Sequence, residues 1–146
     1  MIRQLQLETS WGPLILAGGS RAGEGTLLLV PQLHLALDAG RPHRALPAMK
    51  TVLVSHGHMD HIGGIGYWAS QRQLQNMGPA RLAVPEQIAA DVADLLATHA
   101  RLEGGSPYEI EIVAVTAGQS LSLRKDMGLE FFSTDHWVPT LGSRLV

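Results

Sequence analysis

The sequence predicts a layered α/β fold, built from sheets and helices in a single domain that spans residues 1–146. Three observations predict it: short apolar runs divided by Gly or Pro open the chain, strands and helices alternate in its middle, and further strands close it. Hairpin-linked strands at both ends fit sheet-and-helix layers better than a purely parallel nucleotide-binding sheet. The composition, 45% hydrophobic and 16% charged, is ordinary for one soluble domain.

Strands are expected at the start of the chain. Short apolar runs lie at residues 14–16, 26–30 and 33–37. Glycines at residues 18–19 and 23–25 provide turns between these runs. Such turns can also cradle a phosphate group, but no lysine–serine or helix pattern follows them here. Residues 41–48 contain two prolines and are expected to form a connection with one helical turn.

Two helices are expected to alternate with two strands in the middle of the chain. The apolar run at residues 49–54 predicts a buried strand, and residues 81–84 predict a second one. A helix is expected over residues 62–77, where early glycines suggest tight packing against the preceding loop. Residues 85–102 give the clearest helical pattern, with Pro85 at the first position and glycines directly after the end.

The last part of the chain returns to strands. Residues 108–115 and 120–124 alternate between apolar and polar side chains, and residues 129–133 are apolar. Residues 141–146 look like the opening of another strand that stops without a cap or a polar tail. We therefore expect the chain to be a fragment or a half-domain.

Potential metal ligands are concentrated directly after the strand predicted at residues 49–54. They are His56, His58, Asp60 and His61. Imidazole nitrogen and carboxylate oxygen bind borderline divalent metals, zinc foremost and manganese or iron less often. Residues two apart point the same way in an extended segment, so His56 and His58 can close on one ion. Asp60 and His61 lie past the bend and face a different point, which suits two adjacent metals rather than one. Surface histidines clustered by chance are the alternative interpretation of these four residues.

These residues resemble a known family. Residues 56–61 fit the His-x-His-x-Asp-His signature of the metallo-β-lactamase superfamily, and the wider string 53–64 resembles its ribonuclease Z branch. The Asp-Ala-Gly at residues 38–40 is similar to a turn common in that family. Residues 136–142 resemble the stretch around the family's third metal histidine, so the resemblance covers nearly the whole chain.

The resemblance implies a four-layer αββα sandwich of two similar halves, of which this chain would supply the first half only. It implies that His56, His58 and His136 hold one metal. It assigns Asp60 and His61 to a second metal, and Asp60 could also accept a proton from a bridging water. We expect zinc, two ions per complete site, although manganese and iron accept the same ligands. An exposed loop histidine is the alternative interpretation of His136.

The resemblance implies a metal-dependent hydrolase that cleaves phosphodiester bonds with a hydroxide activated by two metals. The substrate would be the 3′ end of precursor transfer RNA or a small phosphodiester. A lactonase, a thioesterase or a β-lactamase would share residues 56–61. The family's second metal also needs a bridging aspartate and a further histidine downstream of position 136. A metal-binding half-domain without activity of its own, or an inactive relative, is therefore the rival hypothesis.

The composition limits which partners and which cellular location can be expected. The chain has no cysteine, which agrees with a cytoplasmic protein and leaves His, Asp and Glu as metal ligands. No segment approaches the ~20 apolar residues of a membrane span. A net charge of −2 gives no overall footprint for nucleic acid, although a local patch could supply one. Half a sandwich exposes an apolar face, so we expect a homo-oligomer or completion by a missing C-terminal half.

Overall fold

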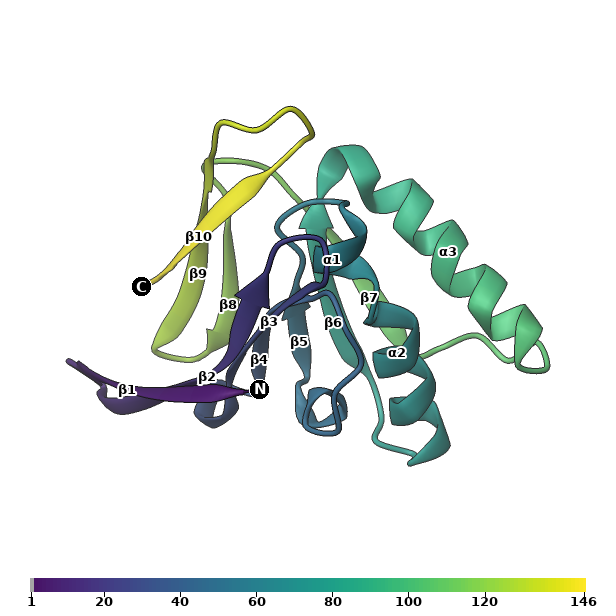
Figure 1. The fold of residues 1–146 in the computed structure, drawn as a ribbon, viewed down its shortest axis with the longest axis horizontal. Helices are drawn as coiled ribbons and strands as arrows, with labels where there is room; N and C mark the ends of the chain where they lie inside the picture. The colour runs from purple at the N-terminus through teal and green to yellow at the C-terminus, as the bar shows by residue number, and fades with distance from the viewer. Residues whose placement is uncertain (1) are drawn as a thin grey trace.

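A seven-stranded sheet whose strands lie in chain order forms the larger part of the molecule (Figure 1). The computed structural model describes residues 2–146. The strands of this sheet are β1 (Arg3–Thr9), β2 (Gly12–Arg21), β3 (Gly25–Val30), β4 (Leu35–Ala39), β5 (Thr51–Leu53), β6 (Ala80–Pro85) and β7 (Ile110–Val115). β1 to β4 pair antiparallel, whereas β4 to β7 pair parallel. The carboxyl ends of β4 to β7 therefore meet at one edge of the sheet.

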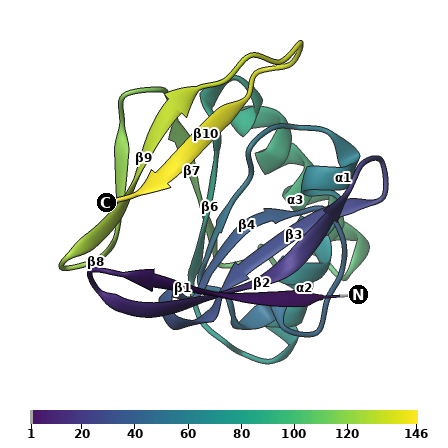
Figure 2. The ribbon, with the colours of Figure 1, turned by 60° about the vertical axis from the view of Figure 1, so that its left-hand side comes forward.

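A second, three-stranded antiparallel sheet packs on one face of the first. It consists of β8 (Ser120–Arg124), β9 (Met127–Ser133) and β10 (Leu141–Leu145), with β9 in the middle. Leu129 and Phe131 of β9 share a core cluster with Leu53 of β5 and Ala83 of β6. Figure 2 shows the small sheet beside the large one, on the side away from α2 and α3.

Helices cover the opposite face of the large sheet. They are α1 (Met59–Ile62), α2 (Ile65–Leu74) and α3 (Ala89–Leu102), with short 3₁₀ turns at Pro31–Leu33, Leu46–Ala48 and Glu86–Ile88. Val52 and Leu82 face Trp68 of α2 and Leu96 of α3, while Leu53 faces the small sheet. Because side chains alternate between the two faces of each strand, the large sheet contributes to two separate hydrophobic cores. Among residues 2–146, no helix is long and apolar enough to cross a membrane.

Most predicted elements are present, with two corrections in the helices. The helix predicted over residues 62–77 is present as α2 but is shorter, because it begins only after Gly63 and Gly64, which separate it from α1. Pro85 does not begin a helix: it is the last residue of β6, and a 3₁₀ turn precedes α3. The terminal stretch forms β10 as expected. β1 had no counterpart among the predicted strands.

Two side chains of α2 fix the start of β5, the strand that leads to the histidine motif. Trp68 is fully buried and donates from Nε1 to the carbonyl of Met49 at 2.9 Å. Arg72 is also buried and donates to the carbonyls of Pro47 at 2.6 Å and Met49 at 3.2 Å. The segment before β5 is therefore held against the helix layer by hydrogen bonds as well as by packing.

Candidate metal centre

The histidine motif leaves the carboxyl end of β5 and bends into α1. Val54 still pairs with the sheet, since its N–H donates to the carbonyl of Ala83 at 2.9 Å. His58 keeps extended dihedrals, φ −66 and ψ 145, and precedes the first residue of α1. His56 and His58 therefore project from an extended segment, while Asp60 and His61 belong to the short helix.

Three histidines from two distant parts of the chain converge at this edge. Candidate ligand atoms of His56, His58 and His136 all lie within 4.8 Å of one another. His56 Nε2 and His58 Nδ1 are 3.1 Å apart. The His136 ring centroid lies 4.8 Å from that of His56 and 5.1 Å from that of His58. His56 is buried, His58 is half-buried and His136 is exposed, so the cluster opens to solvent on one side.

The loop between β9 and β10 delivers His136 to the motif. The first residue of β10, Leu141, donates its N–H to the carbonyl of Ser55 at 3.0 Å. This backbone bond joins the small sheet to the residue directly before His56. Packing of the two sheets is therefore what brings the third histidine to the first two.

Asp38 and Ser55 orient the rings of the motif from behind. Asp38 lies near the carboxyl end of β4, next to β5, and accepts from the Ser55 N–H at 2.7 Å and the Ser55 hydroxyl at 3.0 Å. The same hydroxyl lies 2.9 Å from His56 Nδ1 and can accept its proton. This leaves His56 Nε2 as the lone-pair nitrogen, facing His58. Asp38 and Ser55 were not predicted as site residues.

Asp60 and His61 form a pair at the border of the cluster. His61 Nδ1 lies 2.7 Å from Asp38 Oδ2, so this nitrogen carries the proton and Nε2 is free. His61 Nε2 in turn lies 3.7 Å from Asp60 Oδ2. The rings of His61 and His56 are 4.0 Å apart between centroids. The pair is thus adjacent to the three histidines but separate from the group whose ligand atoms converge.

Close backbone contacts hold this pair in place. A Cβ on Gly40 would lie 1.7 Å from the carbonyl oxygen of Asp60, so only glycine fits there. Gly64 donates its N–H to the carbonyl of Ala39 at 2.6 Å, which ties the start of α2 to the end of β4. Gly23, in the turn between β2 and β3, donates its N–H to Asp60 Oδ2 at 2.9 Å.

The electrostatic surroundings suit metal ligation. Burial lowers the pKa of His56, and the neighbouring His61 lowers it further. The neutral imidazole, which is the form that binds metal, is therefore favoured. The backbone N–H of Gly23 is the main cause of a lowered pKa at Asp60, which favours the carboxylate.

The donor set fits a borderline divalent ion. Tetrahedral ligands about 2.0–2.1 Å from zinc are about 3.3 Å apart, close to the 3.1 Å between His56 Nε2 and His58 Nδ1. Three imidazoles with an open fourth side are typical of zinc sites that bind a water or substrate. Asp60 and His61 offer one oxygen and one nitrogen toward a neighbouring position. The chemistry of these five residues therefore matches the expected ligands, with Asp38 and Ser55 behind them.

Comparison with known proteins identifies the family. A family model described as a β-lactamase superfamily domain matches residues 9–145. The chain is 35% identical over 128 residues to the chloroplastic tRNase Z TRZ2 of Arabidopsis thaliana and 33% identical over 126 residues to a nuclear ribonuclease Z of Triticum aestivum. The crystal structure of the short form of human tRNase Z superposes with a TM-score of 0.58 over 99% of this chain, at 16% identity. The chain belongs to the metallo-β-lactamase superfamily.

The chain matches a different fraction of the length of each relative. It spans 36% of the length of the chloroplastic Arabidopsis relative, 70% of the wheat relative and 64% of the human structure. The comparisons confirm the resemblance to ribonuclease Z proteins and the metallo-β-lactamase-like layers. The cytoplasmic location stays a prediction, since one of these relatives is described as chloroplastic.

Proposed function

We propose that this chain carries the metal site of a metal-dependent hydrolase of the ribonuclease Z type, acting on phosphodiester bonds. The observation that carries the proposal is the convergence of His56, His58 and His136 within 4.8 Å, next to Asp60 and His61. The relatives named ribonuclease Z or tRNase Z support this activity over the lactonase, thioesterase and β-lactamase alternatives. Those three activities share residues 56–61 and are tested with their own substrates on the same preparation.

Each residue of the site has a proposed role. His56, His58 and His136 would hold a first ion, and Asp60 with His61 would contribute to a second. Zinc is the proposed metal, and manganese or iron would accept the same ligands. When bound, the metals would supply a water with a pKa of about 7 and polarise the phosphoryl oxygen.

The chain's own residues orient the ligands and handle the proton. Ser55 and Asp38 fix which nitrogens of His56 and His61 face the site. Asp60 accepts a hydrogen bond from Gly23 through Oδ2, which leaves Oδ1 for a proton from the attacking water. We therefore propose Asp60 as the catalytic proton acceptor in addition to its role as a ligand.

A nucleotide substrate is supported by an aromatic side chain beside the cluster. Trp137 is 84% exposed, and its ring centroid is 5.2 Å from that of His58. An exposed indole next to a hydrolytic centre provides a face on which a base can stack, worth roughly 1–3 kcal/mol per base. The 3′ end of a transfer RNA or a small phosphodiester would both fit this arrangement.

The test measures metal content and hydrolysis of bis(p-nitrophenyl) phosphate together. We expect His58→Ala to lose bound zinc and hydrolysis, because one of the three nitrogens is removed. His34→Asn is the matched control, since His34 lies outside the site and Asn tolerates its left-handed backbone at φ 48. Zinc-loaded wild type without hydrolysis of any phosphodiester would contradict the proposed activity.

The rival proposal is a metal-binding half-domain completed by a second copy or by a C-terminal half. A leucine-rich apolar cavity of about 190 Å³ between the two sheets supports it. Leu7, Leu16 and Leu37 line one side, and Leu129 and Leu145 line the other. Light scattering separates the two: a homo-oligomer with bound zinc but no hydrolysis would favour the half-domain. A stable monomer that hydrolyses the ester would contradict it.

A further inference from the structure

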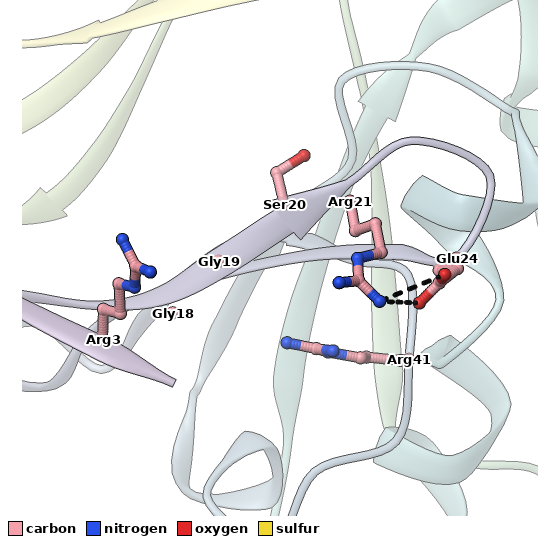
Figure 3. A pocket seen from close by; sticks show the side chains of 7 residues that line it. All are labelled: Arg3, Gly18, Gly19, Ser20, Arg21, Glu24 and Arg41. Carbon is pink, nitrogen blue, oxygen red and sulfur yellow. Dashed lines mark hydrogen bonds and ion pairs between the residues drawn. The ribbon is translucent and has the colours of Figure 1, made fainter. Parts of the chain in front are cut away.

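A groove floored by glycine and flanked by arginines lies at the antiparallel end of the large sheet (Figure 3). Its volume is about 630 Å³, and it is lined by Arg3, Gly18, Gly19, Ser20, Arg21, Glu24 and Arg41. Arg3 of β1 lies at one end, next to Gly18, its partner in the register of β1 and β2. Arg21 and Arg41 lie at the other end, with Glu24 beside Arg21.

Glycine is required at one position in the floor of the groove, because Gly18 has no room for a side chain. A Cβ on Gly18 would lie 1.9 Å from the carbonyl oxygen of Leu27. Gly25 is covered by the aliphatic stem of Arg41, whose carbons would lie 3.2 Å from a Cβ there. Arg41 is thereby laid along the sheet with its guanidinium at the groove. A ligand can approach the backbone of β2 closely while its charges meet arginine at both ends.

The charge of the groove differs in sign from that of the chain. Three arginines and a single glutamate line it, whereas the whole chain has a net charge of −2. Arg21 pairs with Glu24 at 3.3 Å, but both side chains are largely exposed, so this pair is weak. Within residues 2–146, neither Arg3 nor Arg41 has a carboxylate within ion-pair distance. Two cationic groups therefore remain available to a ligand.

The groove borders the candidate metal centre. Its β2–β3 turn donates the Gly23 N–H to Asp60 at 2.9 Å. Arg41 directly follows Gly40, whose backbone packs on the carbonyl of Asp60. The carbonyl oxygen of Arg41 would lie 2.8 Å from a Cβ on Gly64, beside the start of α2. A chain of phosphates lying in the groove would therefore run past residues 56–61, which carry four of the candidate metal ligands.

We propose that this groove binds the phosphodiester backbone of an RNA strand, an inference that rests on the proposed function and adds a substrate-binding surface to it. Cations spaced at the two ends of an elongated groove suit a repeating anion better than a single phosphate. Arginine forks pair with phosphate oxygens in two parallel hydrogen bonds. The glycine floor permits the close approach that a sugar–phosphate backbone requires, without reading base sequence.

The test measures the salt dependence of binding to a fluorescein-labelled oligouridine by fluorescence anisotropy. We expect Arg3→Gln/Arg41→Gln to weaken binding roughly tenfold at low salt. The slope of log K against log salt should fall by roughly 0.7 for each lost phosphate contact. The matched control is Arg101→Gln/Lys125→Gln, which removes the same charge outside the groove and should bind as wild type does. Unchanged thermal unfolding of both variants would show that folding is intact.

Three outcomes would overturn the proposal. The first is wild-type affinity and slope in Arg3→Gln/Arg41→Gln. The second is an equal loss in the control, which would show that only net charge matters. The third is displacement of the RNA by polyglutamate of equal charge, which would indicate a surface for acidic protein instead. Failure of the proposed function is distinguishable, because wild type would then bind oligouridine through the arginines without hydrolysing bis(p-nitrophenyl) phosphate.

Discussion

Asp38 has a left-handed backbone, with φ 60, and its carboxylate lies between Ser55 and His61. Asp is one of the few residues other than Gly that adopt this conformation readily. The sequence pattern pointed to the candidate ligands, since four of the five lie within residues 56–61. It could not identify Asp38 as their support, because its contacts to Ser55 and His61 span 17 and 23 residues. Local spacing carries no information on such contacts.

Gly40→Ala tests how closely the end of β4 must approach residues 56–61, which carry four of the candidate metal ligands. The added Cβ would lie 1.7 Å from the carbonyl oxygen of Asp60, so the loop must shift. We expect the free energy of unfolding in urea to fall by about 1–3 kcal/mol, with weaker zinc binding. Gly57→Ala, within the histidine motif, is the control. A Cβ on Gly57 would meet the side chain of Ile88 at an ordinary 3.7 Å. Equal stability of the two variants would contradict the close-approach argument.

Among the elements, apolar runs and apolar–polar alternation gave most of the predicted strands, including the poorly buried β8. β2 to β6 have buried apolar side chains and were expected, at least in part. β1 is exposed along nearly its whole length and forms through its register with β2, from Arg3–Gly18 to Thr9–Gly12. Leu5 and Leu7 alternate with polar side chains in this segment, and this short alternation was overlooked as a strand signal. The separation of α1 from α2 follows from glycines whose tertiary contacts the sequence only hinted at.

Arg72 connects α2 to two strand starts, and its removal should destabilise the helix layer. Its guanidinium donates to the carbonyls of Pro47, Met49 and Met77 at 2.6 to 3.2 Å. Arg72→Ala would remove the donor to the carbonyls of Pro47 and Met77, while the carbonyl of Met49 would keep only its hydrogen bond from Trp68. We expect a loss of about 3 kcal/mol in the free energy of unfolding. Arg101→Ala, at an exposed position on α3, should change it by less than about 0.5 kcal/mol. Similar losses for both would contradict the anchoring role of Arg72.

Glu103 joins α2, α3 and the start of β7 through two hydrogen bonds. It accepts from Ser70 and from the Tyr108 hydroxyl, each at 2.6 Å. Burial and the hydrogen bond to Glu103 raise the pKa of Tyr108 to about 12. The folded chain then keeps a proton that the unfolded chain loses near pH 10, so stability should fall as pH rises from about 10 to 12.

Ultraviolet absorbance of tyrosinate measures this shift directly. We expect the pKa of Tyr108 to be about 12, and Glu103→Gln to lower the midpoint of Tyr108 because the negative acceptor is gone. Tyr108→Phe assigns the transition by removing it. Thermal unfolding between about pH 10 and 12 should lose less stability in Tyr108→Phe than in wild type. A midpoint unchanged by Glu103→Gln would contradict the contact.

In the molecule as a whole, the proposed metal site depends on two sheets that meet at one edge. The large sheet carries His56 and His58, while the small sheet delivers His136 and is tied to Ser55 through Leu141. The family resemblance pointed to His136, but composition and spacing alone left it as a loop histidine. The arginine groove was beyond prediction, because Arg3, Arg21 and Arg41 come together only through strand pairing. The net charge of −2 for the whole chain also gives no sign of a local cluster of arginines.

We propose that one metal ion binds between histidines from both sheets. Anomalous diffraction at the zinc absorption edge, from crystals grown with zinc, tests it most directly. We predict a peak about 2.0–2.1 Å from a nitrogen of each of His56, His58 and His136. Zinc bound elsewhere with these three rings unliganded, or no peak at saturating zinc, would rule out this metal site.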